Sequence, residues 1–99
     1  MKTYLIQRNL PGAGKLTLAE RKAIAQRSCN VIDEIGHDKL EWQHSYITSD
    51  NLWCVYNAAG EEFLREHARK GNFPCDDIRE IAGILSPATA EIELPEAVA

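Results

Sequence analysis

The stretch from Leu40 to Tyr56, LEWQHSYITSDNLWCVY, most restricts the folds open to this chain. It contains two runs rich in Trp, Tyr, Ile, Val and Thr, separated by Ser49-Asp50-Asn51, and this pattern predicts a β-hairpin. A three-residue hairpin loop is a type I turn followed by one left-handed residue, a conformation that Asn tolerates. The sequence therefore predicts that Asn51 takes the left-handed position.

This predicted loop determines which residues pair across the hairpin. Tyr46 is expected opposite Cys54, and His44 opposite Tyr56. Side chains alternate between the two faces of a strand, so a histidine and a thiol would share one face with aromatic and apolar residues. A one-residue slip in register would break up this grouping. The predicted face consists of Trp42, His44, Tyr46, Leu52, Cys54 and Tyr56.

Two helices are predicted, one before and one after the hairpin. Thr17 and Glu20 form a T-x-x-E capping box, so a helix is expected over 18–35, with the following glycine as its stop. A second helix is expected over 61–70, because acidic residues begin it and basic residues end it. Within this second helix, His67 falls on the inward-facing apolar stripe.

Two further segments are interpreted as strands. Residues 2–8 alternate between polar and apolar types and predict a first strand. The GAGKLT run that follows does not match a phosphate-binding loop, because Asn9 and Leu16 occupy its required glycine and hydroxyl positions. Residues 78–85 suit a helix or a buried strand, and a strand there would complete a βαββαβ unit. The predicted fold class is therefore α+β, of the ferredoxin-like type.

Composition narrows the class of protein. A chain of 99 residues makes one domain, which we expect over 1–90, with 91–99 as a C-terminal tail. The net charge of -4, with acids and bases interspersed, leaves no basic face, so nucleic acid is not an expected partner. No run approaches the roughly 18 apolar residues of a membrane span, and the N-terminus lacks a signal-peptide core. We expect a soluble cytoplasmic protein.

The three cysteines, Cys29, Cys54 and Cys75, indicate neither a disulfide scaffold nor a zinc finger. Their number is odd, and no two of them form a C-x-x-C pair. We expect free thiols in a reducing compartment.

Three phrases of the sequence carry a resemblance to a known family: MKTYLIQRNLPGAGKLT at the start, WQHSYITSDNLWCVYNA in the hairpin and REHARKGNFP near the second helix. Together they resemble the small nickel-binding proteins grouped as domain-of-unknown-function family 4242, over about residues 1–90. The resemblance implies an antiparallel sheet with two helices on one face and a dimeric α+β barrel in which two sheets face each other. It also implies binding of nickel or a similar ion such as zinc, and no established catalysis. Among the matched positions we select five candidate metal ligands: His44, Tyr46, Cys54, Glu66 and His67.

His44 and Cys54 are the central pair of this candidate site. Imidazole suits nickel, zinc and copper, and a nearby thiolate favours softer ions. In the predicted register the two residues are diagonal neighbours on adjacent strands, roughly 7–8 Å apart, which two side chains can close around one ion. The alternative is a structural face, in which His44 bonds to a tyrosine and Cys54 is a buried small hydrophobe.

Each of the other candidate ligands also has an interpretation that does not involve a metal. His67 is compatible with a core histidine paired with a hydroxyl such as that of Ser45. Glu66 points away from the apolar stripe, as a solvated carboxylate would. Asp76 and Asp77 suit either carboxylate ligands or a turn.

Three functions fit these residues. The first is a non-catalytic metal-binding protein that acts as a buffer, carrier or sensor. The second is a small dimeric α+β-barrel enzyme with an apolar pocket for a small molecule and His44 as general acid or base. The third is an inert structural module. The sequence offers no nucleophile–base–orienter set, so the first is preferred, and a homodimer is expected to cover the apolar hairpin face.

Overall fold

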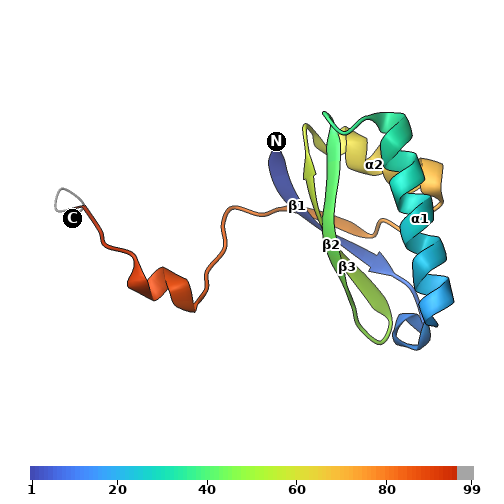
Figure 1. The fold of residues 1–99 in the computed structure, drawn as a ribbon, viewed down its shortest axis with the longest axis horizontal. Coiled ribbons are helices and arrows are strands. Elements are labelled where there is room, and N and C mark those ends of the chain that lie inside the picture. The colour runs from blue at the N-terminus through green and yellow to red at the C-terminus, as the bar shows by residue number, and fades with distance from the viewer. Residues whose placement is uncertain (96–99) are drawn as a thin grey trace.

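The chain folds into a four-stranded antiparallel sheet with two helices on one face (Figure 1). The structure is a computed structural model that describes residues 1–95. The strands lie in the order β2-β3-β1-β4, which is the ferredoxin-like βαββαβ arrangement, so the predicted fold class is confirmed. The elements are β1 (Lys2–Asn9), η1 (Ala13–Lys15), α1 (Leu18–Ile35), β2 (Leu40–Ile47), β3 (Asn51–Ala58), α2 (Glu61–Gly71), β4 (Asp77–Glu80) and η2 (Pro87–Glu91).

Helix α1 begins at the predicted capping box. The Glu20 backbone N–H donates to Thr17 Oγ1 at 3.1 Å, and the Thr17 N–H donates to Glu20 Oε1 at 2.9 Å. These bonds satisfy amides that a helix start otherwise leaves unpaired. The helix ends at Ile35, where Gly36 takes a positive φ of 115°. Both predicted ends of this helix are confirmed.

The two faces of the sheet differ in what covers them. The helix side is packed under α1 and α2, where Ile32 and Leu64 join the core. The open face carries the residues that alternate with these core positions. The helix side of the sheet includes Tyr4, Ile6, Arg8, Leu40, Trp42, Ser45, Ile47, Leu52, Cys54, Tyr56, Ala58 and Ile78, and the open face includes Thr3, Leu5, Gln7, His44, Tyr46, Trp53, Val55, Asn57, Asp77 and Arg79.

The hairpin contains a β-bulge that the sequence analysis did not foresee. Trp42 pairs with Tyr56, yet the next paired residue on β2 is His44, which lies opposite Val55. Gln43 is therefore the extra residue of the bulge, and it shifts the alternation of β2 by one.

The predicted pairing of Tyr46 with Cys54 and of His44 with Tyr56 was wrong. Ser45 lies opposite Cys54, and Tyr46 lies opposite Trp53. As a result, His44 and Cys54 lie on opposite faces of the sheet.

The hairpin loop also differs from the predicted type. Strand β3 already begins at Asn51, whose carbonyl accepts a hydrogen bond from the Thr48 N–H at 3.0 Å. Among residues 1–95, Asn72 after α2 is the one non-glycine residue with positive φ. The prediction of a left-handed Asn51 was therefore wrong.

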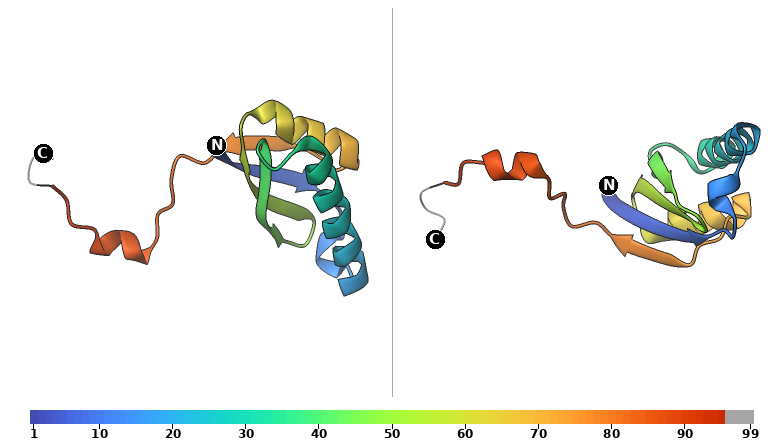
Figure 2. Two further views of the ribbon diagram at one scale, coloured as in Figure 1. Left: turned by 45° about the horizontal axis from the view of Figure 1, so that its top comes forward. Right: turned by 90° about the horizontal axis from the view of Figure 1, so that it is seen from below.

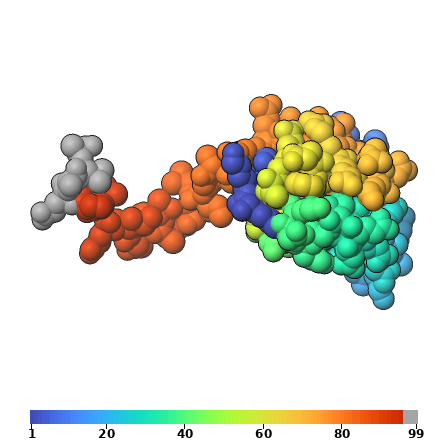
Figure 3. Space-filling view, turned by 90° about the horizontal axis from the view of Figure 1, so that it is seen from above, coloured from blue at the N-terminus to red at the C-terminus, as the bar shows by residue number. Residues whose placement is uncertain are grey.

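Strand β4 is shorter than predicted, and an extended arm follows it. The strand covers 77–80, whereas the prediction was 78–85, and its pairing with β1 ends at Glu80, which lies opposite Tyr4. Residues 82–95, here called the arm, lead away from the sheet (Figures 2 and 3). The last part of the predicted tail, 96–99, lies outside the described residues. No helix in residues 1–95 has the length and apolar character needed to span a membrane.

Candidate functional site

His44 and Tyr46 lie together on the open face. Both side chains are exposed, Tyr46 to 60%, and their ring centroids are 5.0 Å apart at an interplanar angle of 80°. A groove of about 580 Å³ passes over them, bounded by Val55 and the segment 81–84. His44 was expected on the face opposite the helices, and its position there is confirmed.

Cys54 lies on the other side of the sheet from this groove. Its side chain is 3% exposed and packs in the core below the helices. The expectation that Cys54 and His44 share one face was therefore wrong, because the hairpin pairs Ile47 and not Thr48 with Leu52, which places Ser45 opposite Cys54. The buried-hydrophobe alternative describes the position of Cys54 better.

His67 is a core histidine bonded to a hydroxyl. Its side chain is 1% exposed, and Nε2 lies 3.0 Å from Ser28 Oγ, which is 3.4 Å from the Tyr56 hydroxyl. The expected partner Ser45 was wrong, because Ser45 accepts a hydrogen bond from the Trp42 indole at 3.0 Å. Burial, together with the nearby Arg8 guanidinium, lowers the pKa of His67 from 6.5 to about 4. His67 is therefore neutral at pH 7.

Arg8 is a buried cation on the helix side. The residue is 2% exposed, and its guanidinium carbon lies 5.9 Å from the Tyr56 ring centroid and 5.3 Å from that of Phe73. Nη1 donates to the Pro74 carbonyl at 2.6 Å. Within residues 1–95, Nη2 has no hydrogen-bond partner and Arg8 forms no ion pair. Burial without a counter-charge is costly and uncommon for an arginine.

A cavity of about 230 Å³ lies between α1 and the helix side of the sheet. We call it the helix-side cavity. Its wall is mostly apolar, with Arg8 and Arg21 as its two charged residues and no carboxylate among the described lining residues. It is lined by Arg8, Leu16, Arg21, Ile24, Ala25, Ser28, Trp42, Ser45, Ile47, Leu52, Cys54, Tyr56 and Phe73.

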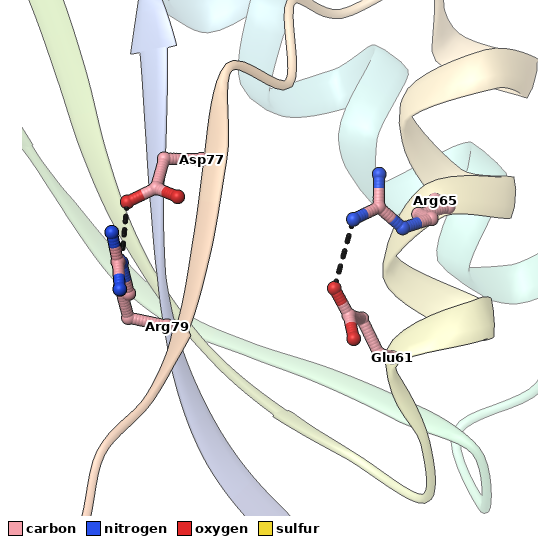
Figure 4. A network of polar contacts seen from close by, with 4 residues as sticks. All are labelled: Glu61, Arg65, Asp77 and Arg79. Carbon is pink, nitrogen blue, oxygen red and sulfur yellow. Dashed lines mark hydrogen bonds and ion pairs between the residues drawn. The ribbon is translucent and has the colours of Figure 1, made fainter.

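The carboxylate candidates lie away from His44. Glu66 is partly exposed on α2, with its Oε1 4.0 Å from Lys70 Nζ. Asp77 pairs with Arg79 at 2.8 Å on β4, as Figure 4 shows beside the Glu61–Arg65 pair of α2. Strand β4 is three strands from β2, or about 14 Å at the usual strand spacing. Asp77 therefore cannot share an ion with His44 of the same chain.

The remaining carboxylate candidate, Asp76, is engaged by the backbone. Its Oδ2 accepts a hydrogen bond from the Asn9 N–H at 2.6 Å. This contact ties the chain ahead of β4 to the end of β1, as expected for the turn alternative.

The described part of the chain does not hold a complete metal site on its own. No group of three or more His, Cys, Asp or Glu side chains in residues 1–95 is placed to hold one ion. On the open face His44 offers an accessible imidazole, which suits nickel, with the Tyr46 phenol beside it. These residues fit part of a nickel site, and an ion bound there needs further ligands.

The roles of Arg8 and Ser28 were not predicted from the sequence. The signal for Arg8 was its place in the alternation of β1, where Tyr4 and Ile6 precede it on the same face. An arginine in such a series must be buried unless the strand ends before it. Ser28 is a buried residue of α1, but its partners come from β3 and α2, which no local pattern reveals.

Comparison with known proteins agrees with this architecture. A family model described as nickel responsive protein SCO4226-like matches residues 4–81. The crystal structure of SCO4226 from Streptomyces coelicolor A3(2) superposes with a TM-score of 0.70 at 12% identity, over 84% of this chain and 99% of that chain. At this identity the likeness shows the fold alone. No curated protein matches the sequence significantly. The family match nevertheless spans most of the chain, which therefore belongs to the SCO4226-like family of nickel-responsive proteins.

Proposed function

We propose that the chain is a non-catalytic nickel-type metal-binding protein that binds its ion on the open face through His44. The observation that carries the proposal is the position of His44, exposed beside Tyr46 in the open-face groove of a chain from a nickel-responsive family. A neutral imidazole on an accessible surface can bind a metal without rearrangement of the core. Buried His67 and Cys54 offer no such access.

A second copy of the chain would complete the ligand set. The open face has no helix over it, and Leu5, Trp53 and Val55 are only partly covered there. A two-fold pairing of open faces would cover these side chains and bring a second His44 to the same interface. The dimeric α+β barrel implied by the family resemblance has this arrangement, and it stays a prediction.

The enzyme alternative has less support. It required His44 to act as general acid or base beside an apolar pocket. The apolar helix-side cavity, however, is separated from His44 by the sheet, and the histidine nearest to it, His67, is neutral and buried.

The test compares two exposed histidines. Nickel binding to protein without an affinity tag is measured by isothermal titration calorimetry for the wild type, His44→Ala and His37→Ala. His44→Ala should weaken binding about tenfold or more, since the loss of a group that only supports a ligand already costs about 10–100-fold. His37, which bonds to Asp33 at 2.7 Å in an exposed turn, is the matched control and should leave the affinity unchanged. Equal affinities for all three proteins would contradict the proposal.

The absorption spectrum tests the ligand type independently. A thiolate on nickel gives a near-ultraviolet charge-transfer band, whereas imidazole and phenol do not give that band. We expect no such band, and Cys54→Ser should bind nickel as the wild type does. If a thiolate band appeared in the wild type and disappeared in Cys54→Ser, the ion would bind at Cys54 on the helix side, and the open-face site would be wrong.

A further inference from the structure

The helix-side cavity contains a charge without a counter-charge. Arg8, at 2% exposure, keeps Nη2 without a partner in residues 1–95, and no carboxylate lines the cavity among the described residues. Among the described wall residues the other charged one is Arg21, an exposed side chain whose Nε donates to the Leu16 carbonyl at 3.2 Å. Both charged groups of the wall are therefore positive.

We propose that this cavity binds a small carboxylate with an apolar body, whose carboxylate pairs with Arg8. A carboxylate supplies the missing counter-charge, and arginine binds it through charge-assisted hydrogen bonds. The mostly apolar wall, with Ile24, Trp42 and Leu52, favours a hydrocarbon body over a phosphate or a sugar. The inference does not rest on the nickel site, which lies across the sheet.

The volume limits the size of this ligand. A cavity of about 150 Å³ lined by apolar residues holds one benzene ring. The helix-side cavity, at about 230 Å³, therefore has room for a single ring with a short carboxylate side chain. An aryl-acetate is a simple member of this class with that size.

The groups around Arg8 do not compete with such an anion. His67 is neutral, and its Nε2 is engaged with Ser28. The Tyr56 hydroxyl stays protonated because burial raises its pKa. A ligand carboxylate thus meets one cation and neutral hydroxyls, and no fixed negative charge from the described wall.

Phenylacetate is the probe for this proposal. Its binding to the full-length protein, in the presence of a metal chelator, is followed by calorimetry and by the NMR signal of the Trp42 indole N–H. Phenylacetamide and phenethylamine serve as neutral and cationic isosteres. Phenylacetate should bind saturably at one site, about tenfold or more tighter than phenylacetamide, as one charge-assisted hydrogen bond predicts. Absence of saturable binding, or equal affinity for the amide, would overturn the proposal.

Variants of the two wall arginines show which positive charge binds the carboxylate. Arg8→Met should weaken phenylacetate binding about tenfold or more and still fold, since replacing a buried charge by an apolar group is often neutral or stabilising. Arg21→Gln is the matched control and should change the affinity less than about threefold. If Arg21→Gln abolished binding while Arg8→Met did not, the assignment to Arg8 would be wrong.

A second variant keeps the test decisive if Arg8→Met fails to fold. Ala25→Phe places a ring inside the cavity from α1 and leaves Arg8 unchanged. It should abolish phenylacetate binding and the shift of the Trp42 signal. Unchanged binding in folded Ala25→Phe would place the ligand elsewhere and contradict the proposal.

Discussion

Arg8 and His67 form a buried pair on the helix side, and only one of them is charged. The Arg8 guanidinium helps lower the pKa of His67, after the larger effect of burial. The rings of Phe73 and Tyr56 pack against the His67 ring, and the Ser28 hydroxyl is hydrogen-bonded to His67 Nε2. Protonation of His67 would place a second positive charge inside the core near Arg8, and burial of an unpaired charge is costly.

His67 should make the protein sensitive to acid. Because its folded pKa of about 4 lies below its unfolded value of 6.5, the unfolded chain binds the proton first. The contribution of His67 to the free energy of unfolding is therefore fully present above pH 6.5 and is lost as the pH drops toward 4. His67→Gln, which cannot titrate, should lose less stability over this range, by a difference of about 3 kcal/mol at most.

Urea unfolding at pH 7 and pH 4 measures this difference. His37→Gln is the control, because His37 is exposed and should leave the acid sensitivity as it is in the wild type. If wild type and His67→Gln lost stability in parallel, His67 would not be held neutral by its surroundings.

At the level of elements, α1 shows how far local sequence determines structure. Its start and its glycine stop were both predicted, because a capping box and a glycine after the last turn are local patterns. Its N-terminal half packs less tightly, since Ile24 and Ala25 are only half-buried, and the helix-side cavity lies beneath it.

The capping box should stabilise the fold and have no role in nickel binding. Thr17→Ala removes the oxygen that accepts the Glu20 N–H and should lower the free energy of unfolding by about 0.5–2 kcal/mol. Glu20→Gln preserves the box and is the matched variant, with a smaller effect expected at pH 7. Denaturant unfolding measures both, and loss of nickel binding in folded Thr17→Ala would instead assign the preceding loop to the site.

The two strands of the hairpin were predicted from the sequence, but their pairing was not. The two strands were expected from their composition, but the side of each residue depended on the register at the loop, where Ile47 and not Thr48 lies opposite Leu52. This register places Ser45 and Ile47 on the helix side, and the bulge at Gln43 brings Trp42 to the same side. The position of His44 on the open face was foreseen, and its separation from Cys54 was not.

Deleting Gln43 tests the bulge directly. With Gln43 absent, Trp42 and His44 would follow each other in a regular ladder opposite Tyr56 and Val55, so His44 would stay on the open face. The deletion should therefore keep the fold, seen by circular dichroism, and nickel binding within about threefold of the wild type, as expected for a ligand left in place. A folded variant without nickel binding would show that the bulge itself shapes the site.

On the scale of the whole molecule, one sheet separates two different surfaces. The helix side holds Arg8 and its cavity, and the open face holds His44 and its groove. The arm adds length, so that the radius of gyration of 16.1 Å exceeds the roughly 13 Å of an ordinary 100-residue domain. The arm also exposes Ile84, Leu85, Ile92 and Leu94, and it lies beyond residue 81, where the family match ends.

The open face should be the dimer interface, and two matched substitutions test this. Leu5 lies at the centre of that face between Val55 and Arg79, whereas Leu18 is 82% exposed at the start of α1. Leu5→Glu would bury a carboxylate in the interface, although Arg79 can partly neutralise it in the monomer. The wild type and Leu18→Glu should scatter light as particles of twice the 11.1 kDa chain mass, and Leu5→Glu as single chains.

The same two substitutions should also differ in their effect on nickel binding. If a second copy completes the ligand set at His44, monomeric Leu5→Glu should bind nickel more weakly, although Leu5 itself is no ligand. Leu18→Glu should bind as the wild type does. A Leu5→Glu protein that remained dimeric, with Leu18→Glu monomeric, would place the interface on the helix side. A monomeric Leu5→Glu with full nickel affinity would show that one chain suffices for the metal, because the ligands beyond His44 would then be water or side chains of the same chain.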